Sequence, residues 1–382
     1  MLWLAGALVA CTLGTDPSSQ PAQASGDAVR ARTPRAHTKT IVSQPYSIDR
    51  KYSSMRGPYG FDDVVLLETE TPELLWIVGY RTTVIDEGGG PMSQEFMCHA
   101  NLDFEPPDYA SRFPTAPPVS GRIFTLSQGQ QSIQLPQGFG VPVTSDLPIS
   151  LVTQVLNLNI EKPENLTVRH RVEIDFVRDS EVEGEMVPLF QGAVEGFKAL
   201  GEARFYGFDD HEVDPDLMGA GCSPGMAAVD GETDDDVLGQ QFTAHWVVPP
   251  GREVNVTNVT RFLGLPYDTT VHYIAVHVHP YAESLLLRDA TANQTVYESK
   301  VTPAKGRIGI ERIEHFESVE GVKLFADHQY ELVSTYDNTS DTDADSMAVM
   351  YMYMRDQKFQ RPSLVPRATA EKRAPEDRAP HM

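Results

Sequence analysis

The sequence predicts an all-β protein built from two antiparallel, jelly-roll-like β-sandwich domains in tandem. Short apolar runs rich in Val, Ile and Tyr recur along the chain, and Gly- and Pro-rich clusters separate them. The chain contains 28 Gly and 28 Pro among 382 residues, which favours loop-rich β structure over helices. The runs fall into two series, and each series is long enough for one sandwich.

The first series predicts an N-terminal sandwich over residues 46–180. Its runs are "DVVLLET", "LLWIVGYRTTVI", "GRIFTL", "ISLVTQVLNLNI" and "RVEIDFV". The second series predicts a C-terminal sandwich over residues 185–356, with the runs "MVPLFQGAVEGF", "HWVVPPGREVNVTNV", "HYIAVHVH", "ESLLLRD", "YELVSTY" and "MAVMYMYM". Gly- and Pro-rich spacing of this kind is typical of antiparallel sandwiches.

An acidic stretch over residues 207–239 interrupts the second series and predicts a surface insertion. Its segment "DDHEVDPD" offers oxygen ligands for a divalent cation but lacks the fixed spacing of a calcium loop, so a solvated acidic loop is favoured. Residues 21–45 and 357–382 are polar and aperiodic. They predict a disordered linker and a disordered tail.

The chain opens with "MLWLAGALVACTLGTD", which predicts a signal peptide over residues 1–20. Five asparagines stand in N-x-S/T sequons: Asn165, Asn255, Asn258, Asn293 and Asn338. They favour a secreted or lumenal glycoprotein, although threonine is also common near turns. The alternative is a bacterial lipoprotein, because "LVAC" resembles a lipoprotein cleavage box that would place the lipid anchor at Cys11.

The formal net charge of −23 argues against nucleic-acid and anionic-membrane partners, since nothing basic offsets phosphate repulsion. No later segment approaches eighteen uninterrupted apolar residues, so we expect no membrane span. Beyond Cys11 the chain has two cysteines, Cys98 and Cys222, which allow one disulfide.

The run "HYIAVHVHPY", residues 272–281, raises the question of a metal site. On a strand His277 and His279 share a face, whereas His272 points the other way. Two imidazoles two residues apart can reach one ion. A pair of ordinary strand histidines is the simpler alternative.

A third ligand is available in "DTDADSMAVMYMYMRD". As a strand, this segment places Met347, Tyr351 and Tyr353 on one face, and Met350 and Met352 on the other, where core packing is favoured. Met347 opens the strand after a polar loop. A thioether selects Cu(I) and imidazole suits copper generally, so His277, His279 and Met347 would form a His₂Met copper site.

An H-x-H strand followed some seventy residues later by D-x-M and a Tyr- and Met-rich strand resembles the copper type II, ascorbate-dependent monooxygenases. This family includes peptidylglycine alpha-hydroxylating monooxygenase and dopamine beta-monooxygenase. The stretches "HWVVPPGREVNV" and "GVKLFADHQYELVSTYDNTS" are similar to the family as well. The resemblance implies two sandwiches, a copper at His277, His279 and Met347, and C–H hydroxylation with O₂ and ascorbate as reductant.

The resemblance fails at the family's first-domain copper site, which three histidines hold. In "HANLDF" His99 remains, but Ala100 replaces its neighbour, and in "QVLNLN" Leu156 stands in place of the third histidine. Cys98 could substitute as a thiolate, but a disulfide to Cys222 or a buried thiol is as good an interpretation. His170 is a further candidate, for which a solvated strand position is favoured. We therefore expect one copper per chain.

The residues that bind the substrate in that family also differ in this sequence. Ala275 stands where an arginine of the peptide-amidating branch grips its substrate, while Tyr351 matches a tyrosine of that substrate pocket or is a core residue. The substrate, a small molecule or a peptide, is unspecified. The leading hypothesis is a secreted copper monooxygenase-like protein. The alternatives are a non-catalytic copper-binding or interaction protein of the same fold, and a sandwich whose histidines and Met347 only pack.

Overall fold

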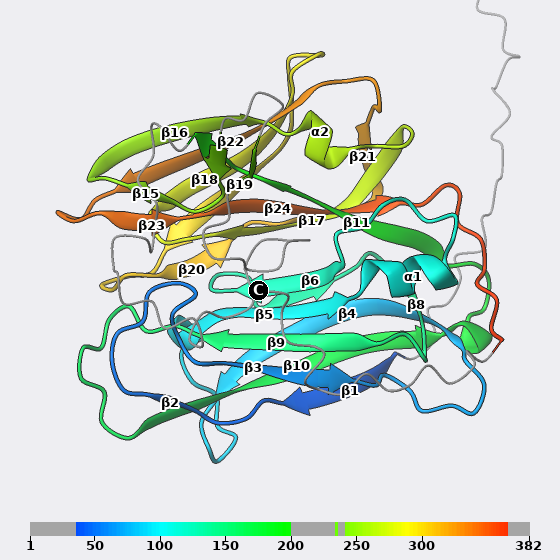
Figure 1. Ribbon diagram of the computed structural model, residues 1–382, viewed down its shortest axis with the longest axis horizontal. Coiled ribbons are helices and arrows are strands. Elements are labelled where there is room, and N and C mark those ends of the chain that lie inside the picture. The colour runs from blue at the N-terminus through cyan, green and yellow to red at the C-terminus, as the bar shows by residue number, and fades with distance from the viewer. Residues whose placement is uncertain (1–35, 200–233, 236–240, 366–382) are drawn as a thin grey trace, which may run out of the picture.

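The computed structural model describes residues 36–199, 234–235 and 241–365. Strands dominate it and the helices are short (Figure 1), so the predicted all-β fold is confirmed. The predicted signal peptide, Cys11, Cys222 and all of the insertion except residues 234–235 lie outside the described residues.

The N-terminal sandwich consists of two sheets. The first sheet runs in the order β1 (His37–Val42), β10 (Leu166–Arg178), β4 (Leu74–Ile85) and β8 (Phe139–Thr144), with β2 (Tyr46–Ile48) on β10 and β7 (Ser132–Gln134) on β4. The second runs in the order β3 (Tyr59–Val64), β9 (Ile149–Val155), β5 (Met97–Phe104) and β6 (Arg122–Ser127). Helix α1 (Pro106–Arg112) and the 3₁₀ turns η1 (Gln94–Phe96) and η2 (Asp179–Glu181) connect strands.

The C-terminal sandwich also has two sheets. One contains β11 (Val187–Glu195), β24 (Ala348–Arg355), β17 (Thr269–Val278) and β21 (Phe316–Leu324). The other runs β16 (Gly251–Asn258), β22 (Tyr330–Asn338), β18 (Ala282–Asp289), β19 (Gln294–Pro303) and β20 (Ile310–Ile313). Smaller elements are helix α2 (Thr260–Leu263), the ribbon of β15 (Trp246–Val248) and β23 (Ala344–Ser346), and the sheet of β12 (Lys198–Ala199), β14 (Gln241–Thr243) and β13 (Asp234–Asp235).

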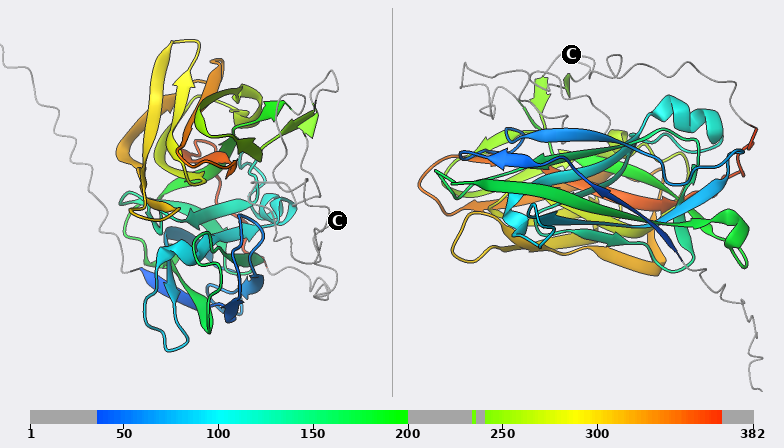
Figure 2. Two further views of the ribbon diagram at one scale, coloured as in Figure 1. Left: turned by 90° about the vertical axis from the view of Figure 1, so that its left-hand side faces the viewer. Right: turned by 90° about the horizontal axis from the view of Figure 1, so that it is seen from below.

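The two sandwiches share a sheet. Strands β8 and β11 pair in parallel, with Val187 opposite Phe139, and this pair joins the N-terminal sheet that contains β4 to the C-terminal sheet that contains β24. The result is a single ten-stranded sheet. Seen from the side, the blue-to-green N-terminal sandwich lies directly against the yellow-to-orange C-terminal one (Figure 2).

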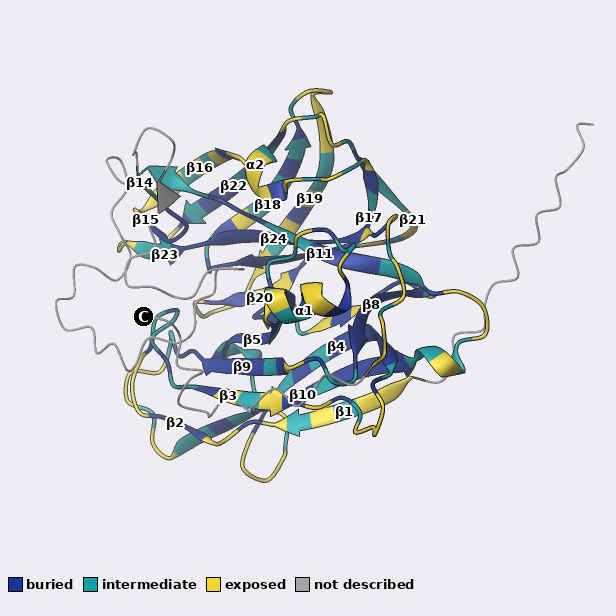
Figure 3. Cartoon of the chain, turned by 45° about the vertical axis from the view of Figure 1, so that its right-hand side comes forward, coloured by how far each residue is buried: buried dark blue, intermediate teal, exposed yellow. Residues whose placement is uncertain are grey.

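Strand β24 serves both hydrophobic cores. Met347, just before the strand, joins Val349, Tyr351 and Tyr353 in the N-terminal core, whereas Met350, Met352 and Met354 fill the C-terminal core. This is the alternation that the sequence predicts. The strand is accordingly buried along almost its whole length (Figure 3). The interface between the sandwiches is therefore packed like an interior, since Tyr353 also stacks on Phe124 of β6.

Two predicted boundaries are wrong. Strand β1, residues 37–42, pairs antiparallel with β10 inside the segment predicted as a disordered linker. Residues 357–365, predicted as disordered, pack on the N-terminal sandwich, where the Phe359 ring contacts Trp76 and Phe113. The polar composition of both segments does not indicate that they are ordered. An edge strand, or a segment that packs along a surface, needs few apolar residues of its own.

Candidate metal centre

His277 lies at the end of β17 and His279 directly follows the strand, and both are almost completely buried, at 4% and 3% exposure. Their ring centroids are 5.5 Å apart and the ring planes are nearly perpendicular. The two imidazoles are therefore neighbours, as the sequence predicts. His272 lies apart from them: its ring packs on Phe139 and contacts Thr270 Oγ1 and the Ser318 carbonyl, beside a bulge that interrupts the alternation of β17.

Met347 lies beside the histidines because β17 and β24 are paired. His277 is opposite Val349 and Val278 is opposite Ala348, so Met347 immediately precedes the paired segment at the His279 end. The Tyr336 hydroxyl accepts hydrogen bonds from the backbone N–H groups of both His279 and Met347, each at 3.3 Å, and donates to the Met347 carbonyl. The buried Tyr336 thus fixes the two backbones to each other.

Two further polar side chains reach this place, and the sequence analysis missed both. His245 precedes β15, which pairs with β23, and its ring centroid is 6.1 Å from that of His279. Asp345, on β23, places Oδ2 2.9 Å from His279 Nδ1. The "HWVV" and "DADSM" segments contained these residues, but their convergence depends on a ribbon of three-residue strands that has no clear periodicity of its own.

The pKa shifts divide these residues into a charged pair, His279 and Asp345, and two neutral histidines, His245 and His277. Burial alone would lower the pKa of His279, but the Asp345 carboxylate more than reverses this effect and raises it. Burial likewise opposes ionisation of Asp345, yet His279 and a hydrogen bond from Ser54 lower its pKa. His279 and Asp345 therefore form a buried ion pair.

The neighbouring histidines are neutral. Burial lowers the pKa of His245 to about 3 and that of His277 well below its usual range, and the charge of His279 lowers both further. Neutral imidazole is the form that binds a metal ion, because its lone pair is free.

The unpaired nitrogens are the strongest sign that this group fits a metal. Among the described residues, both ring nitrogens of His277 and His279 and Nε2 of His245 are buried without a hydrogen-bond partner, as are both ring nitrogens of His99 and His170; His279 Nδ1 faces Asp345 Oδ2 at 2.9 Å. Buried polar atoms nearly always have partners, so such a set calls for an explanation such as a missing ion. As the side chains stand, no three His, Cys, Asp or Glu residues in the described ranges converge closely enough to hold a metal. A pair of imidazoles with a thioether lies outside that residue set.

The N-terminal candidate site is different. His99, on β5, is buried, and burial lowers its pKa to about 3, with Arg122 adding to the effect. Ala100 and Leu156, where the resemblance would require histidines, are buried apolar residues. His170 was expected to be solvated, and this is wrong. It is fully buried on β10 beside Tyr46, and burial lowers its pKa to about 4.

The two remaining candidates of this region are also buried. The Cys98 side chain is enclosed, and its possible disulfide partner Cys222 lies outside the described residues. Tyr351, which matched a substrate-pocket tyrosine, is completely buried in the N-terminal core. It therefore occupies a packing position in this structure.

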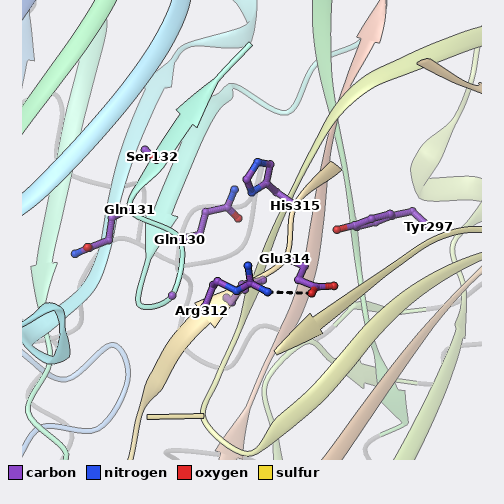
Figure 4. A pocket seen from close by; sticks show the side chains of 9 residues that line it. Gln130, Gln131, Ser132, Tyr297, Arg312, Glu314 and His315 are labelled. Atoms are coloured by element: carbon purple, nitrogen blue, oxygen red, sulfur yellow. Dashed lines mark hydrogen bonds and ion pairs between the residues drawn. The ribbon is translucent and has the colours of Figure 1, made fainter. Parts of the chain in front are cut away.

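A pocket of about 460 Å³ opens where the two sandwiches meet (Figure 4). Gln130, Tyr297, Arg312, Glu314 and His315 are among the residues that line it. Its wall connects to the histidine strand: Gln130 Oε1 accepts a hydrogen bond from the backbone N–H of Val276, next to His277, and Gln130 Nε2 donates to the Tyr273 hydroxyl.

The sequon asparagines lie in varied surroundings. Asn165, Asn258 and Asn293 are exposed, and Asn255 is half-buried. The glycosylation prediction is wrong for Asn338, because its side chain is buried and its amide donates to the carbonyls of Val248 and Thr342. A glycan on that nitrogen would replace one of its two hydrogens and so remove at least one of these hydrogen bonds.

In the part of the chain that the structure describes, no helix is both long and apolar enough to cross a membrane.

Comparisons with known proteins give little further information. No family model and no curated protein matches the sequence. Among solved structures, the chain is similar to the STIV MCP, with a TM-score of 0.33 and 9% identity over 85% of this chain and 98% of that one. It is also similar to the major capsid protein P2 from bacteriophage PM2, with a TM-score of 0.29 and 10% identity over 85% and 100% of the two chains.

A further similarity is to PNGase F, a glycosylasparaginase from Flavobacterium meningosepticum, with a TM-score of 0.33 and 7% identity over 86% of this chain and 99% of that one. At these scores and identities the similarities carry no argument about function. The resemblance to the copper monooxygenases therefore rests on the sequence motifs alone.

Proposed function

We propose that this protein binds a single copper ion at His277, His279 and Met347, between its two sandwiches. The observation that carries the proposal is the pair of buried imidazoles 5.5 Å apart with unpaired ring nitrogens, beside the backbone of a buried methionine. Two imidazoles and a thioether suit Cu(I). Copper bound there would accept the lone pair of neutral His277 and, with release of the proton on Nε2, that of His279.

Burial favours copper binding over hydroxylation as the main activity. Met347 is fully buried and the two histidines are at most 4% exposed, so a substrate has no direct path to the site as it stands. The first-domain ligands that the family uses to supply an electron are replaced by Ala100 and Leu156. A binding function needs neither substrate access nor a second metal.

A second candidate function is copper-dependent C–H hydroxylation with O₂ and ascorbate. The pocket lined by Gln130 and His315 favours it, because Gln130 contacts the backbone of β17 one residue from His277. In this case the pocket would hold the substrate and β17 would connect it to the copper ligands. Reductant-dependent O₂ consumption separates this function from copper binding alone.

The test of the proposal is copper stoichiometry of the purified, tag-free protein, together with Cu(I) competition against a chelator. We expect about one copper per chain in the wild type and none in His277→Ala. His315→Ala is the matched control, because it removes an exposed histidine outside the cluster. Two coppers per chain would show that the N-terminal sandwich retains a site, and no copper would overturn the proposal.

We also propose that the protein passes through the secretory pathway and carries glycans at exposed sequons, chiefly Asn165, Asn258 and Asn293. Their exposure supports the proposal. Glycosidase treatment of the protein expressed in a eukaryotic host should lower its apparent mass. Substitution Asn338→Gln should not change the number of glycans.

A further inference from the structure

We propose that strand β16 is a self-association edge, on which a second copy of this chain pairs antiparallel through the same strand. The sheets that contain β16 in the two copies would then join into one continuous sheet across a two-fold axis. This inference does not depend on the copper site, because it concerns the outer sheet of the C-terminal sandwich.

One edge of β16 is open. The strand pairs with β22, and in the described part of the chain no strand pairs with its other edge. It lies at the outer margin of the C-terminal sandwich (Figure 1). Just beyond the strand, the N–H of Val259 donates to the Tyr330 carbonyl, and this bond sets the alternation. Odd-numbered residues of β16 bond to β22, so even-numbered residues direct their backbone N–H and C=O groups to the open edge.

The side chains along this edge are exposed and partly apolar. Val254 and Val256 are 55% and 52% exposed, and they lie on the same face of the strand. Residues 254–258 carry no charge, and the Arg252 guanidinium is paired with the Glu283 carboxylate at 3.1 Å. An exposed apolar edge without charged residues is a surface on which another strand can pair.

Other edge strands carry features that prevent such pairing. Strand β20 is only four residues long, and β1 contains Lys39. Strand β21 has an exposed valine as well, Val319, but Glu317 and Glu320 flank it and a bulge interrupts the pairing with β17. Short length, charged residues and bulges are the usual protections of a sheet edge. The centre of β16 lacks them.

The occupant that fits β16 best is β16 itself. In an antiparallel pair centred on Asn255, Val254 of one copy lies opposite Val256 of the other, so the valines of both copies meet on one face. The even-numbered residues then lie opposite each other, as their outward backbone groups require. Arg252 lies opposite Asn258, so no like charges face each other. The contact uses the same surface on both copies and therefore closes at a dimer.

The predicted interface is small. A single strand pair buries less area than the roughly 1,200 Å² of stable interfaces, so we expect a weak dimer whose population depends on concentration. The formal net charge of −23 opposes association of two copies. Added salt screens this repulsion, so the dimer should be more populated at high salt than at low salt.

Asn258 connects this edge with the proposed glycosylation. Its side chain is exposed, and in the pair it lies opposite Arg252 of the second copy. A glycan on Asn258 would occupy the space that the second strand needs. The pairing therefore belongs to the chain without a glycan at Asn258, and a glycan there would protect the edge as charged residues protect others.

The first test is sedimentation velocity over a concentration series with unglycosylated protein from a bacterial host. We expect a monomer–dimer equilibrium in the wild type. Val254→Lys should weaken dimerisation at least about tenfold, because the dimer loses both cross-strand valine pairs and gains two ammonium groups. Val256→Lys should act in the same way, whereas Val319→Lys, at the exposed valine of β21, is the matched control and should not change the equilibrium.

Thermal unfolding of the same variants shows whether each one is folded. A wild type that stays monomeric over the whole series would overturn the proposal. A dimer that neither Val254→Lys nor Val256→Lys weakens would overturn it too, because its interface would lie elsewhere.

The second test uses protein from a eukaryotic host. The chain with a glycan at Asn258 should be monomeric, and Asn258→Gln should dimerise as the bacterial protein does. A dimer that persists with the glycan in place would overturn the proposal. Absence of a glycan at Asn258 overturns only the glycosylation proposal at that residue, because the bacterial protein tests the edge by itself. Copper stoichiometry should be equal in Val254→Lys and wild type.

Discussion

The two sandwiches differ in the residues that they place where the resemblance predicts copper ligands. In the N-terminal one, Ala100 and Leu156 are buried apolar residues, and His99 remains, buried with both ring nitrogens unpaired. At the C-terminal one, His277, His279 and His245 are buried together with nitrogens that have no hydrogen-bond partner among the described residues. Unpaired imidazole nitrogens therefore occur in both regions, at His99 and His170 as well, and the difference is that the C-terminal imidazoles lie ring to ring, with centroids 5.5 and 6.1 Å apart.

The difference is informative because unpaired buried polar groups are costly. Each costs about 1–3 kcal/mol relative to a paired one, whereas an apolar residue of similar shape is close to neutral. Ala100 and Leu156 avoid that cost. Three imidazoles with unpaired nitrogens at one interface accumulate it, which is expected where a bound ion compensates.

The largest expected effect is a loss of stability as the pH falls. His99 and His170 are neutral in the fold, with pKa values of about 3 and 4, but titrate near 6.5 when unfolded. The unfolded chain therefore binds more protons below pH 6.5, and stability is lost as the pH falls toward 4. Each group contributes at most about 1.4 kcal/mol per pH unit and less near pH 6.5, so the two lower the free energy of unfolding by roughly 4 kcal/mol between pH 7 and pH 5.

Denaturant unfolding of the copper-free protein at pH 7, 6 and 5 measures this effect. His245 acts in the same direction, whereas His279, whose pKa is raised, acts in the opposite one because its contribution is lost as the pH rises. His170→Phe should reduce the slope by about 1.4 kcal/mol per pH unit. Equal stability of the wild type at pH 7 and 5 would contradict the prediction.

The next effect is stabilisation by copper, which should act through the C-terminal cluster. A ligand that binds only the folded state at 1,000 times its Kd stabilises by about 4 kcal/mol. We expect Cu(I) under reducing conditions to raise the Tm of the wild type and of His99→Leu. The Tm of His277→Ala should not move. A Tm shift that survives in His277→Ala would place the copper elsewhere.

The sequence predicted those features that follow from local periodicity. Alternation along β24 correctly separated Met347 and Tyr351 from Met350 and Met352, and alternation along β17 placed His277 beside His279. What it could not predict depends on contacts between distant segments. The burial of His170 depends on packing beside Tyr46. The approach of His245 to His279 depends on the pairing of β15 with β23, two strands about a hundred residues apart in the sequence.

A smaller effect tests whether Met347 is a ligand or only packs. Met347→Leu conserves volume, so it should lower the free energy of unfolding by less than about 1.5 kcal/mol. If the thioether binds copper, the Cu(I) affinity should also fall about tenfold, while the Cu(II) affinity changes little because thioethers prefer the softer ion. Met350→Leu, on the opposite face of β24, is the control and should leave both affinities unchanged.

The smallest effect concerns His99, and it determines whether the two regions are independent. Replacing a buried imidazole that has unpaired nitrogens with an apolar residue of similar size is neutral or stabilising, so His99→Leu should change the free energy of unfolding at pH 7 by no more than about 1 kcal/mol. The variant should keep the wild-type copper stoichiometry and lose part of the acid sensitivity, because one depressed histidine is gone. Loss of copper with an intact fold would mean that His99 belongs to the C-terminal cluster. The N-terminal sandwich would then hold one side of a shared site, and the apolar residues at Ala100 and Leu156 would mark only the part of that site that was given up.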